Sequence, residues 1–169
     1  MTTSDSLPID RTGGLPPTPH QDKVPALTPG RLVASKGKAA TGYAGDVSPL
    51  QAFQWWQSGD AVLVDVRTDE EREWVGFVPG AIALPWKTWP GMALNPAFED
   101  GIKAAVPAGK KVVLLCRSGV RSVAAAQCAD RLGIAAYNIL EGFEGDADQN
   151  AHRGNKGGWR LRGLPWQQR

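Results

Sequence analysis

The sequence predicts an α/β domain built on a small, largely parallel central sheet. Two observations support this prediction: apolar runs rich in β-branched residues, and helical candidates that alternate with them. The runs are continuous rather than alternating, as expected for parallel strands buried on both faces. In open parallel sheets the ligand site lies outside the carboxyl ends of the strands, so the residues that follow the runs are the first functional candidates.

Regular structure is predicted to begin near Asp46. The order Asp46-Val47-Ser48-Pro49 places a capping hydroxyl before a proline suited to the first helical position, and Leu50, Phe53 and Trp56 follow at helical spacing. Strands are predicted over residues 61–66, 81–84, 111–116 and 136–140. Helical candidates lie between them at about residues 69–74, 96–105 and 119–132.

The N-terminal part of the chain has a different composition. Seven of the 13 prolines fall in the first 50 residues, and residues 7–30 mix Pro, Gly and Thr without any period. We therefore expect a disordered or extended arm over residues 1–45 and one domain over residues 46–169. The 169 residues agree with this single-domain organisation.

Charge and composition exclude several classes of function. The formal net charge is only +2, which predicts no nucleic-acid surface. No long apolar run or leader segment is visible, so a soluble, cytoplasmic protein without a membrane partner is expected. Two cysteines make no disulfide framework, and two distant histidines, His20 and His152, predict no metal site.

The most informative stretch follows the apolar run at residues 111–115. That run leads directly into Cys116, then a short loop, then an alanine-rich helix, and the predicted loop and helix start comprise Arg117, Ser118, Gly119, Val120, Arg121 and Ser122. A short loop backed by a helix N-terminus forms an anion cradle, and Gly119 supplies the freedom such a turn needs. Because such a cradle favours both a thiolate and an oxyanion substrate, Cys116 is the predicted nucleophile.

These residues carry a resemblance to a known family. The loop Cys116–Arg121 with Ser122 resembles the active-site loop of rhodanese-like sulfurtransferases. Further similar segments are Asp-Val-Arg at 65–67 with an acidic helix start, Pro-Gly-Ala at 79–81, Glu-Gly-Phe at 141–143, Gly-Gly-Trp at 157–159 and Gly-Leu-Pro at 163–165. The resemblance covers about residues 46–166 and implies a sheet of about five strands with helices on both faces. It also implies transfer of a sulfane sulfur through a cysteine persulfide.

Two positions depart from the family pattern. Phe77 stands where many members have a histidine, so no imidazole is expected there. Glu141 stands at the first glycine of the turn after the last strand, and a carboxylate facing the pocket would weaken an anion site.

The chemistry expected of this loop needs no metal, flavin or nucleotide. The Cys116 thiolate attacks a donor such as thiosulfate, Arg117 and Arg121 hold the sulfonate oxygens, and a thiophilic acceptor then takes the sulfur. The acceptor is cyanide, a thiol or a protein, and in one alternative the domain is a persulfide carrier or regulatory module that docks through the N-terminal arm. A Cdc25-like phosphatase or arsenate reductase is less favoured, because such enzymes have Cys-x5-Arg whereas this loop has Cys-x4-Arg.

Several other residues have two interpretations. Asp65 and Arg67 end their strand near the expected site and could support the loop. The favoured alternative is that Arg67 pairs with Glu70 or Glu71 at the start of the next helix. Cys128 is expected to fill the core and His152 to lie on the surface. Trp86 and Trp89 either wall the mouth of the site or pack a long connection, and the basic C-terminal segment that begins with Arg153 either adds positive potential or compensates preceding acids.

Overall fold

The computed structural model describes residues 42–169 and contains a five-stranded parallel sheet. The strand order is β1-β7-β6-β2-β3. The strands are β1 (Gly45–Val47), β2 (Ala61–Asp65), β3 (Ile82–Ala83), β6 (Lys111–Leu115) and β7 (Ala136–Ile139). The predicted fold class, α/β with a largely parallel central sheet, is therefore confirmed. Of the arm predicted over residues 1–45, residues 1–41 lie outside the described part of the chain.

Within residues 42–169, four helices connect the strands and begin within about two residues of the predicted positions. They are α1 (Pro49–Gln57), α2 (Asp69–Val75), α3 (Phe98–Ala105) and α4 (Arg121–Arg131). Ser48 caps α1 by accepting a hydrogen bond from the backbone N–H of Gln51, and Pro49 occupies the first helical turn. Thr68 caps α2 in a reciprocal arrangement with Glu71.

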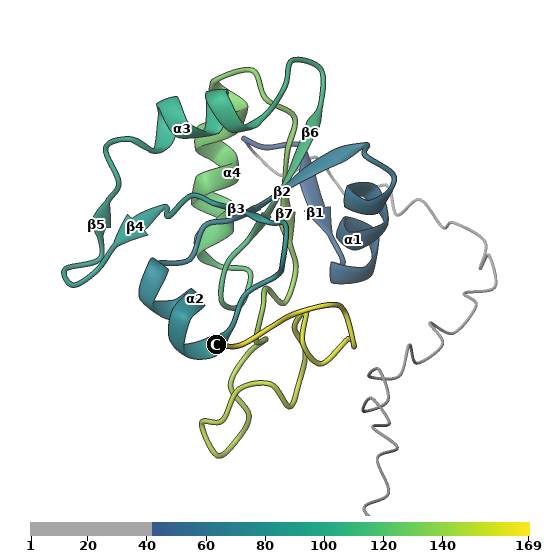
Figure 1. Ribbon diagram of the computed structural model, residues 1–169, viewed down its shortest axis with the longest axis vertical. Helices are drawn as coiled ribbons and strands as arrows, with labels where there is room; N and C mark the ends of the chain where they lie inside the picture. Colours follow the sequence, from purple (N-terminus) through teal and green to yellow (C-terminus); the bar gives the residue numbers. More distant parts are fainter. Residues whose placement is uncertain (1–41) are drawn as a thin grey trace, which may run out of the picture. The chain divides into compact units, whose positions relative to one another are not determined.

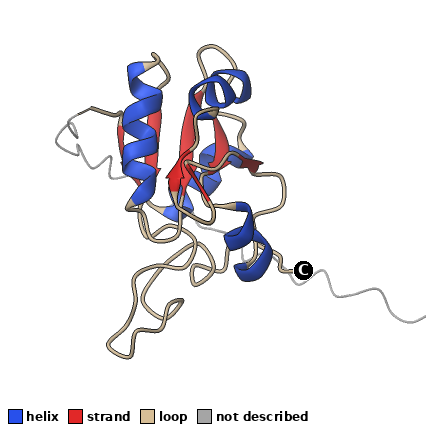
Figure 2. Ribbon diagram, turned by 90° about the vertical axis from the view of Figure 1, so that its left-hand side faces the viewer, coloured by secondary structure: helices blue, strands red, loops and turns tan. Residues whose placement is uncertain are grey.

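The helices cover both faces of the sheet and create two apolar layers (Figures 1 and 2). On one face, Phe98 and Ile102 of α3 and the alanines of α4 pack against Val64 and Leu114. On the other face, Ala52 of α1 and residues of the C-terminal segment pack against alternate strand residues such as Leu63 and Val113. Burial on both faces explains why the strand sequences are continuously apolar.

The strand register aligns three carboxyl ends at one edge of the sheet. Asp65 of β2 lies opposite Leu115 of β6, and Leu114 lies opposite Asn138 of β7. The segments that follow β2, β6 and β7 therefore leave the sheet side by side. The yellow C-terminal segment lies at the same end of the molecule (Figure 1).

Two features are not predicted by the sequence. One is β1, which pairs with β7 and is preceded by a hydrogen bond from Ala44 N to Ala136 O. The other is a short antiparallel hairpin of β4 (Lys87–Thr88) and β5 (Ala93–Leu94). Strands of two or three residues are too short to show a period, so only their pairing partners define them. Within residues 42–169, no helix is both long and apolar enough to cross a membrane.

Candidate active site

Cys116 lies directly after the central strand β6, where the chain turns into α4. The residue is only 1% exposed, yet it lines a cavity of about 650 Å³. The backbone N–H of Gly119 donates to its Sγ at 3.2 Å, and Ser122 Oγ lies 3.1 Å from the same sulfur. Cys116 thus borders the cavity while its sulfur is held by polar groups, which is the arrangement expected of a nucleophilic cysteine.

Two glycines allow the Cys116 loop to take this shape. Gly119 has a φ of +85°, and a Cβ there would lie 3.1 Å from Glu141 N. Gly142, in the turn after β7, has a φ of +60°, and a Cβ there would lie 2.5 Å from Cys116 O and 2.6 Å from Ser118 N. A side chain would be tight at Gly119 and has no room at Gly142, so the turn after β7 and the loop after β6 pack closely against each other.

Backbone hydrogen bonds fix the outer side of the loop to the same turn. Phe143 N donates to Cys116 O at 2.8 Å, and Glu144 N donates to Arg117 O at 2.9 Å. The carbonyl groups of Cys116 and Arg117 are thus bound by the backbone of residues 143–144. The following helix α4 has no side-chain cap at Val120, and the N–H groups of a first helical turn have no intrahelical partner. This end of the helix therefore favours negative charge.

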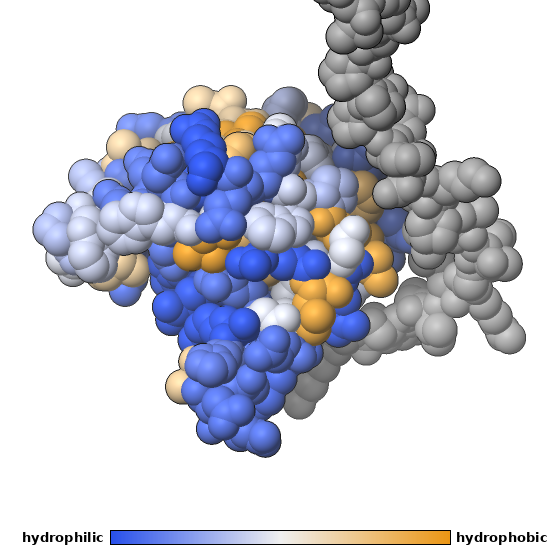
Figure 3. Space-filling model, turned by 60° about the horizontal axis from the view of Figure 1, so that its bottom comes forward, coloured by the Kyte–Doolittle hydropathy of each residue, from blue (hydrophilic) through white to orange (hydrophobic). Residues whose placement is uncertain are grey.

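The cavity beside Cys116 combines cationic, acidic and apolar walls. Its basic side chains are Arg117, Arg121 and Arg153, its acidic ones are Glu71 and Asp146, and its apolar ones are Trp89, Met92 and Val120. Figure 3, turned to bring the bottom of the molecule forward, shows a mostly hydrophilic surface with smaller hydrophobic patches. The cavity can accommodate a small anion next to the sulfur and an apolar group at its mouth.

Arg121 lines the cavity as one half of an ion pair. Its Nη1 and Nη2 donate to the two carboxylate oxygens of Glu71 on α2, at 2.8 and 2.5 Å. Burial alone would raise the pKa of Glu71, but the hydrogen bonds from Arg121 and Thr68 hold that pKa below its ordinary value. Two of the five guanidinium N–H groups are used in this pair, which leaves the others for an anion in the cavity.

Arg117 and Arg153 provide the other two positive charges. Arg117 is exposed, and Ser118 and Val120 line the cavity with it, Val120 being 71% exposed. Arg153 belongs to the C-terminal segment, and its Nη1 donates to Gly145 O at 2.7 Å. The sequence leaves the role of this segment open because nothing in its local pattern indicates that Arg153 returns to the Cys116 loop.

The two tryptophans of the connection after β3 have different surroundings. Trp86 packs edge-on against Phe98 with 4.8 Å between ring centroids, and so belongs to the core. Trp89 is 55% exposed and lines the cavity. Trp86 therefore packs the connection against the core, whereas Trp89 forms part of the cavity wall.

Arg67 does not pair with Glu70 or Glu71, contrary to the favoured interpretation of the sequence. Its Nη2 donates to Asp65 Oδ2 at 2.7 Å and to Gly76 O at 2.8 Å, and both members of the pair are almost fully buried. The guanidinium also stacks on the Phe143 ring, with 3.9 Å between Cζ and the ring centroid. The Phe143 N–H in turn donates to Cys116 O, so Arg67 contacts a residue that binds the loop, and neither Arg67 nor Asp65 lines the cavity beside Cys116.

Neither departure from the family pattern reaches the sulfur. Glu141 has a φ of +67°, and its carboxylate binds the guanidinium of Arg162 and the backbone N–H of Gly158. The hydrogen bond from Arg162 holds the pKa of Glu141 below its ordinary value, against the effect of burial. Phe77 forms an isolated bridge with Gln167. Glu141 thus ties the C-terminal segment to the turn after β7 and does not line the cavity beside Cys116.

The remaining candidates lie away from the sulfur. Cys128 is a buried free thiol on α4 whose Sγ lies 3.6 Å from Glu99 Oε1, and burial followed by the nearby carboxylate raises its pKa. His152 is exposed and lies outside the cavity lining, and His20 is not among the described residues. Over residues 42–169, no group of three or more His, Cys, Asp or Glu side chains is placed to hold a metal ion.

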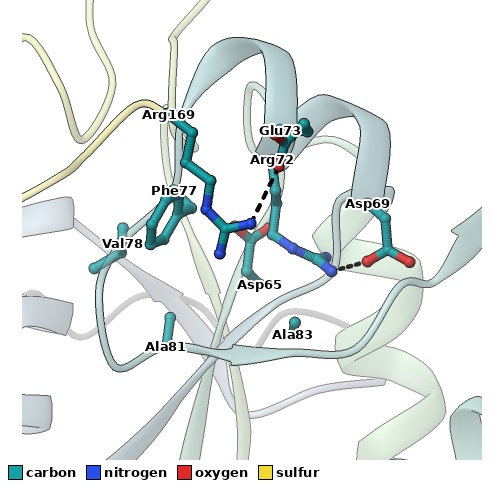
Figure 4. A pocket seen from close by; sticks show the side chains of 9 residues that line it. All are labelled: Asp65, Asp69, Arg72, Glu73, Phe77, Val78, Ala81, Ala83 and Arg169. Atoms are coloured by element: carbon teal, nitrogen blue, oxygen red, sulfur yellow. Dashed lines mark hydrogen bonds and ion pairs between the residues drawn. The ribbon is translucent and has the colours of Figure 1, made fainter.

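A second, smaller cavity of about 300 Å³ lies between α2 and the segment around β3 (Figure 4). Its walls include Asp65, Phe77 and two ion pairs, Arg169 with Glu73 and Arg72 with Asp69. It contains no residue of the Cys116 loop.

Comparison with protein families gives one match that covers most of the described chain. A model described as "Rhodanese-like domain" matches residues 48–149, a range that includes Cys116 and the loop after it. Among curated proteins, an uncharacterized protein of Rickettsia conorii is 36% identical over 132 residues, which is 72% of this chain and 96% of that protein.

Solved structures show the same similarity. The crystal structure of Rv0390 from M. tuberculosis has a TM-score of 0.68 and 41% identity, covering 74% of this chain and 98% of the other. A rhodanese-related protein from Thermoplasma volcanium has a TM-score of 0.51 at 19% identity, with 72% and 96% of the two chains covered, and so shares the fold.

Proposed function

This chain belongs to the rhodanese-like domain family, and on that premise we propose that it is a sulfurtransferase that carries a sulfane sulfur as a persulfide on Cys116. One observation carries the proposal. Cys116 lines a cavity walled by three arginines, and its sulfur accepts the N–H of Gly119. A sulfur that is held by polar groups and lies beside an anion-binding wall is suited to attack on a sulfur oxyanion.

In the first half-reaction the Cys116 thiolate attacks the outer sulfur of thiosulfate. The new bond joins Sγ to that sulfur, the S–S bond within thiosulfate breaks, and sulfite leaves with the bonding electron pair. No external oxidant or reductant takes part. The total charge is the same before and after the step, because the thiolate becomes a persulfide anion while the dianionic donor leaves as dianionic sulfite.

In the second half-reaction an acceptor attacks the outer sulfur of the persulfide. With cyanide the products are thiocyanate and the regenerated Cys116 thiolate, so the cycle closes. Between the two steps the negative charge resides on the outer sulfur. The positive end of α4 and the arginines on the cavity wall stabilise this charge.

The arginines have unequal roles in this scheme. Arg117 is exposed and takes no part in an ion pair among the described residues, so it is the main ligand proposed for the sulfonate oxygens of the donor. Arg121 is held by Glu71 and contributes its remaining N–H groups. Arg153 approaches from the C-terminal segment and adds a third charge.

A protein acceptor is the second candidate, and the mouth of the cavity supports it. Trp89 is 55% exposed, Val120 is 71% exposed, and both line the cavity, so a partner that covers them would gain apolar burial next to the persulfide. In this form the domain acts as a persulfide carrier. A persulfide cycle requires a reduced cysteine, and both cysteines are free, so we also propose a cytoplasmic location.

Intact-mass analysis after thiosulfate treatment tests the proposal. We expect one added sulfur atom on the wild type and on Cys128→Ser, and none on Cys116→Ser, with cyanide-dependent release of thiocyanate in parallel. An adduct that survives in Cys116→Ser would refute the assignment of the nucleophile. Hydrolysis of an aryl phosphate without any response to thiosulfate would favour the phosphatase instead. Sulfur loading followed by poor transfer to cyanide but rapid transfer to protein thiols would favour the carrier.

A further inference from the structure

A loop of the C-terminal segment brings two opposite charges to the cavity beside Cys116. Residues 145–158 leave the turn after β7 and return to it, and both Arg153 and Asp146 line the cavity. The scheme above uses Arg153 in binding the donor and leaves Asp146 without a role. A carboxylate on the wall of a site for sulfur oxyanions opposes their binding, so thiosulfate alone does not explain this wall.

The two ends of this loop are in direct backbone contact. A Cβ at Gly145 would collide with Gly157 O, and a Cβ at Gly158 would lie 2.6 Å from Glu144 C. Both positions have a positive φ, of +77° at Gly145 and +104° at Gly158. Residues 145–158 therefore form a closed surface loop of the Ω type, whose ends are fixed beside the turn after β7.

Asp148 ties the interior of the loop together. Its carboxylate accepts hydrogen bonds from the backbone N–H groups of Asn150 and His152, both at 2.9 Å, and from Asn155 Nδ2 at 2.8 Å. The hydrogen bond from Asn155, followed by those from the backbone, holds the pKa of Asp148 below its ordinary value. Because three donors converge on one carboxylate, the loop presents its cavity-lining side chains from a defined backbone.

Arg153 and Asp146 can both bind a ligand. Arg153 Nη1 donates to Gly145 O at 2.7 Å, which uses one of the five guanidinium N–H groups. Among the described residues, no ion pair includes Arg153 or Asp146. A guanidinium binds a carboxylate through two parallel hydrogen bonds, and a carboxylate binds an ammonium group. The two side chains thus match an α-amino acid, which carries both groups on one carbon atom.

The cavity is large enough for an organic molecule next to the sulfur. Its volume of about 650 Å³ lies within the range of about 300–1,000 Å³ that is typical of small-molecule sites. Trp89, Met92 and Val120 supply an apolar part of the wall against which a carbon chain can pack. A thiosulfate ion has no carbon chain and uses neither this part of the wall nor Asp146.

We propose that the acceptor of the Cys116 persulfide is an α-amino acid that carries a thiol, and that Arg153 and Asp146 select it. Arg153 binds the carboxylate of the acceptor and Asp146 binds its ammonium group, while the thiol faces the outer sulfur of the persulfide. This assignment rests on the persulfide function proposed above and specifies the acceptor, which that function leaves open.

The transfer balances without an oxidant or a reductant. The thiol passes its proton to the outer sulfur of the persulfide, and the resulting thiolate attacks that same sulfur. A new S–S bond joins the acceptor to the outer sulfur, and the bond between that sulfur and Sγ breaks. The bonding electron pair stays on Sγ, so Cys116 returns to the thiolate and the acceptor leaves as an amino-acid persulfide.

Single-turnover transfer to three related thiols tests the proposal. The full chain is loaded with thiosulfate and freed of excess donor, and the loss of the added sulfur is followed by intact mass with cysteine, cysteamine or N-acetylcysteine at equal thiolate concentration. Cysteamine lacks the carboxylate, and N-acetylcysteine lacks the ammonium group. We expect cysteine to react about 5- to 20-fold faster than cysteamine and about 2- to 5-fold faster than N-acetylcysteine, the second ratio being smaller because Asp146 is exposed.

Two variants assign the two ratios to their residues. Arg153→Gln should abolish the preference for cysteine over cysteamine and keep the preference over N-acetylcysteine, whereas Asp146→Asn should do the reverse. Lys156→Gln is the matched control, because it removes a positive charge from an exposed position of the same loop that does not line the cavity, and it should keep both ratios. Each ratio compares thiols on one variant, so a general loss of activity does not imitate the result.

The outcomes separate this proposal from the function on which it rests. Equal rates for the three thiols on the loaded wild type, or the same pair of ratios in Arg153→Gln as in Lys156→Gln, would overturn the assignment of the acceptor and leave the persulfide function intact. Failure of thiosulfate to load Cys116 would overturn the proposed function and this proposal together.

Discussion

Replacing Gly142 by alanine places a methyl group between the turn after β7 and the Cys116 loop. The new Cβ would lie 2.5 Å from Cys116 O and 2.6 Å from Ser118 N, both backbone atoms that no rotation of a side chain can move away. The φ of +60° adds backbone strain for any residue with a Cβ. The loop must therefore shift by several tenths of an ångström or more.

Gly109→Ala is a matched control for the strain. Gly109 has a φ of +80°, and apart from its chain neighbours no heavy atom lies within 4 Å of the place a methyl group would take. Alanine there meets the same backbone penalty without the clash. We expect Gly109→Ala to lower the free energy of unfolding by about 1–2 kcal/mol. Overpacking adds about 1–3 kcal/mol, so Gly142→Ala should lower it by about 2–5 kcal/mol.

Two assays separate stability from the geometry of the site. Urea denaturation followed by tryptophan fluorescence gives the free energies of unfolding, provided that the slopes with urea agree among the variants. Thiosulfate loading of Cys116, measured under conditions where each variant is folded, reports the position of the loop. We expect loading of Gly142→Ala to slow by about 10- to 100-fold, because a small displacement of reacting groups is costly. Gly109→Ala should load at the wild-type rate.

Equal losses of stability in the two variants, together with equal loading rates, would refute the reasoning. That result would mean that the loop after β6 does not depend on the close approach of Gly142. A loss of stability in Gly142→Ala without any change in loading would show that the loop yields on the side away from the sulfur.

Three further predictions follow from the buried and half-buried charges and from the cavity wall. Arg67→Met leaves the Asp65 carboxylate buried without its partner and should lower the free energy of unfolding by about 3–5 kcal/mol, measured by urea denaturation; a loss below about 1 kcal/mol would contradict the role of this pair. The pKa of Glu71 is lower in the folded protein than in the unfolded chain, so its contribution to stability is present above about pH 4.3 and is lost as the pH falls through the folded-state value. Wild type should therefore lose more stability than Glu71→Gln on acidification, and identical pH profiles would show that the pair with Arg121 does not contribute. Trp89→Ala should raise KM about 2- to 10-fold for a thiosulfonate donor that carries a phenyl group, with a smaller change for thiosulfate; equal changes would exclude Trp89 as a wall for apolar groups.

The sequence is sufficient for the fold class and for the location of the candidate nucleophile. Continuous apolar runs, the Ser48-Pro49 helix start and the strand-to-helix position of Cys116 are all local signals, and each is reproduced within a few residues. Gly119 is also recognisable from its place in the loop, and its φ of +85° explains why a glycine stands there. Local signals suffice here because helix caps, strand burial and tight turns depend on residues a few positions apart.

The partners of the charged residues cannot be predicted in the same way. The sequence favours the acidic start of α2 as the partner of Arg67, but burial at the end of β2 brings it to Asp65 and the Phe143 ring. Arg121 and Glu71 are separated by 50 positions and meet because α2 and α4 begin at the same edge of the sheet. A sequence shows which residues can ionise, but it does not show which of several opposite charges becomes the neighbour.

Tertiary structure alone determines how the surroundings of the sulfur are assembled. Arg153 and Trp89 come from the C-terminal segment and the connection after β3, and neither segment has a period that would place it over the Cys116 loop. In the sequence, Asn138 is a single polar residue within an apolar strand. Its hydrogen bonds to Ser122 and Asp46 form only because β7 lies between β1 and β6. The sequence by itself determined the fold class and pointed to Cys116 as the candidate nucleophile, since both follow from local patterns. The side chains that line the cavity beside it come from distant segments, which only the packing of the sheet brings together.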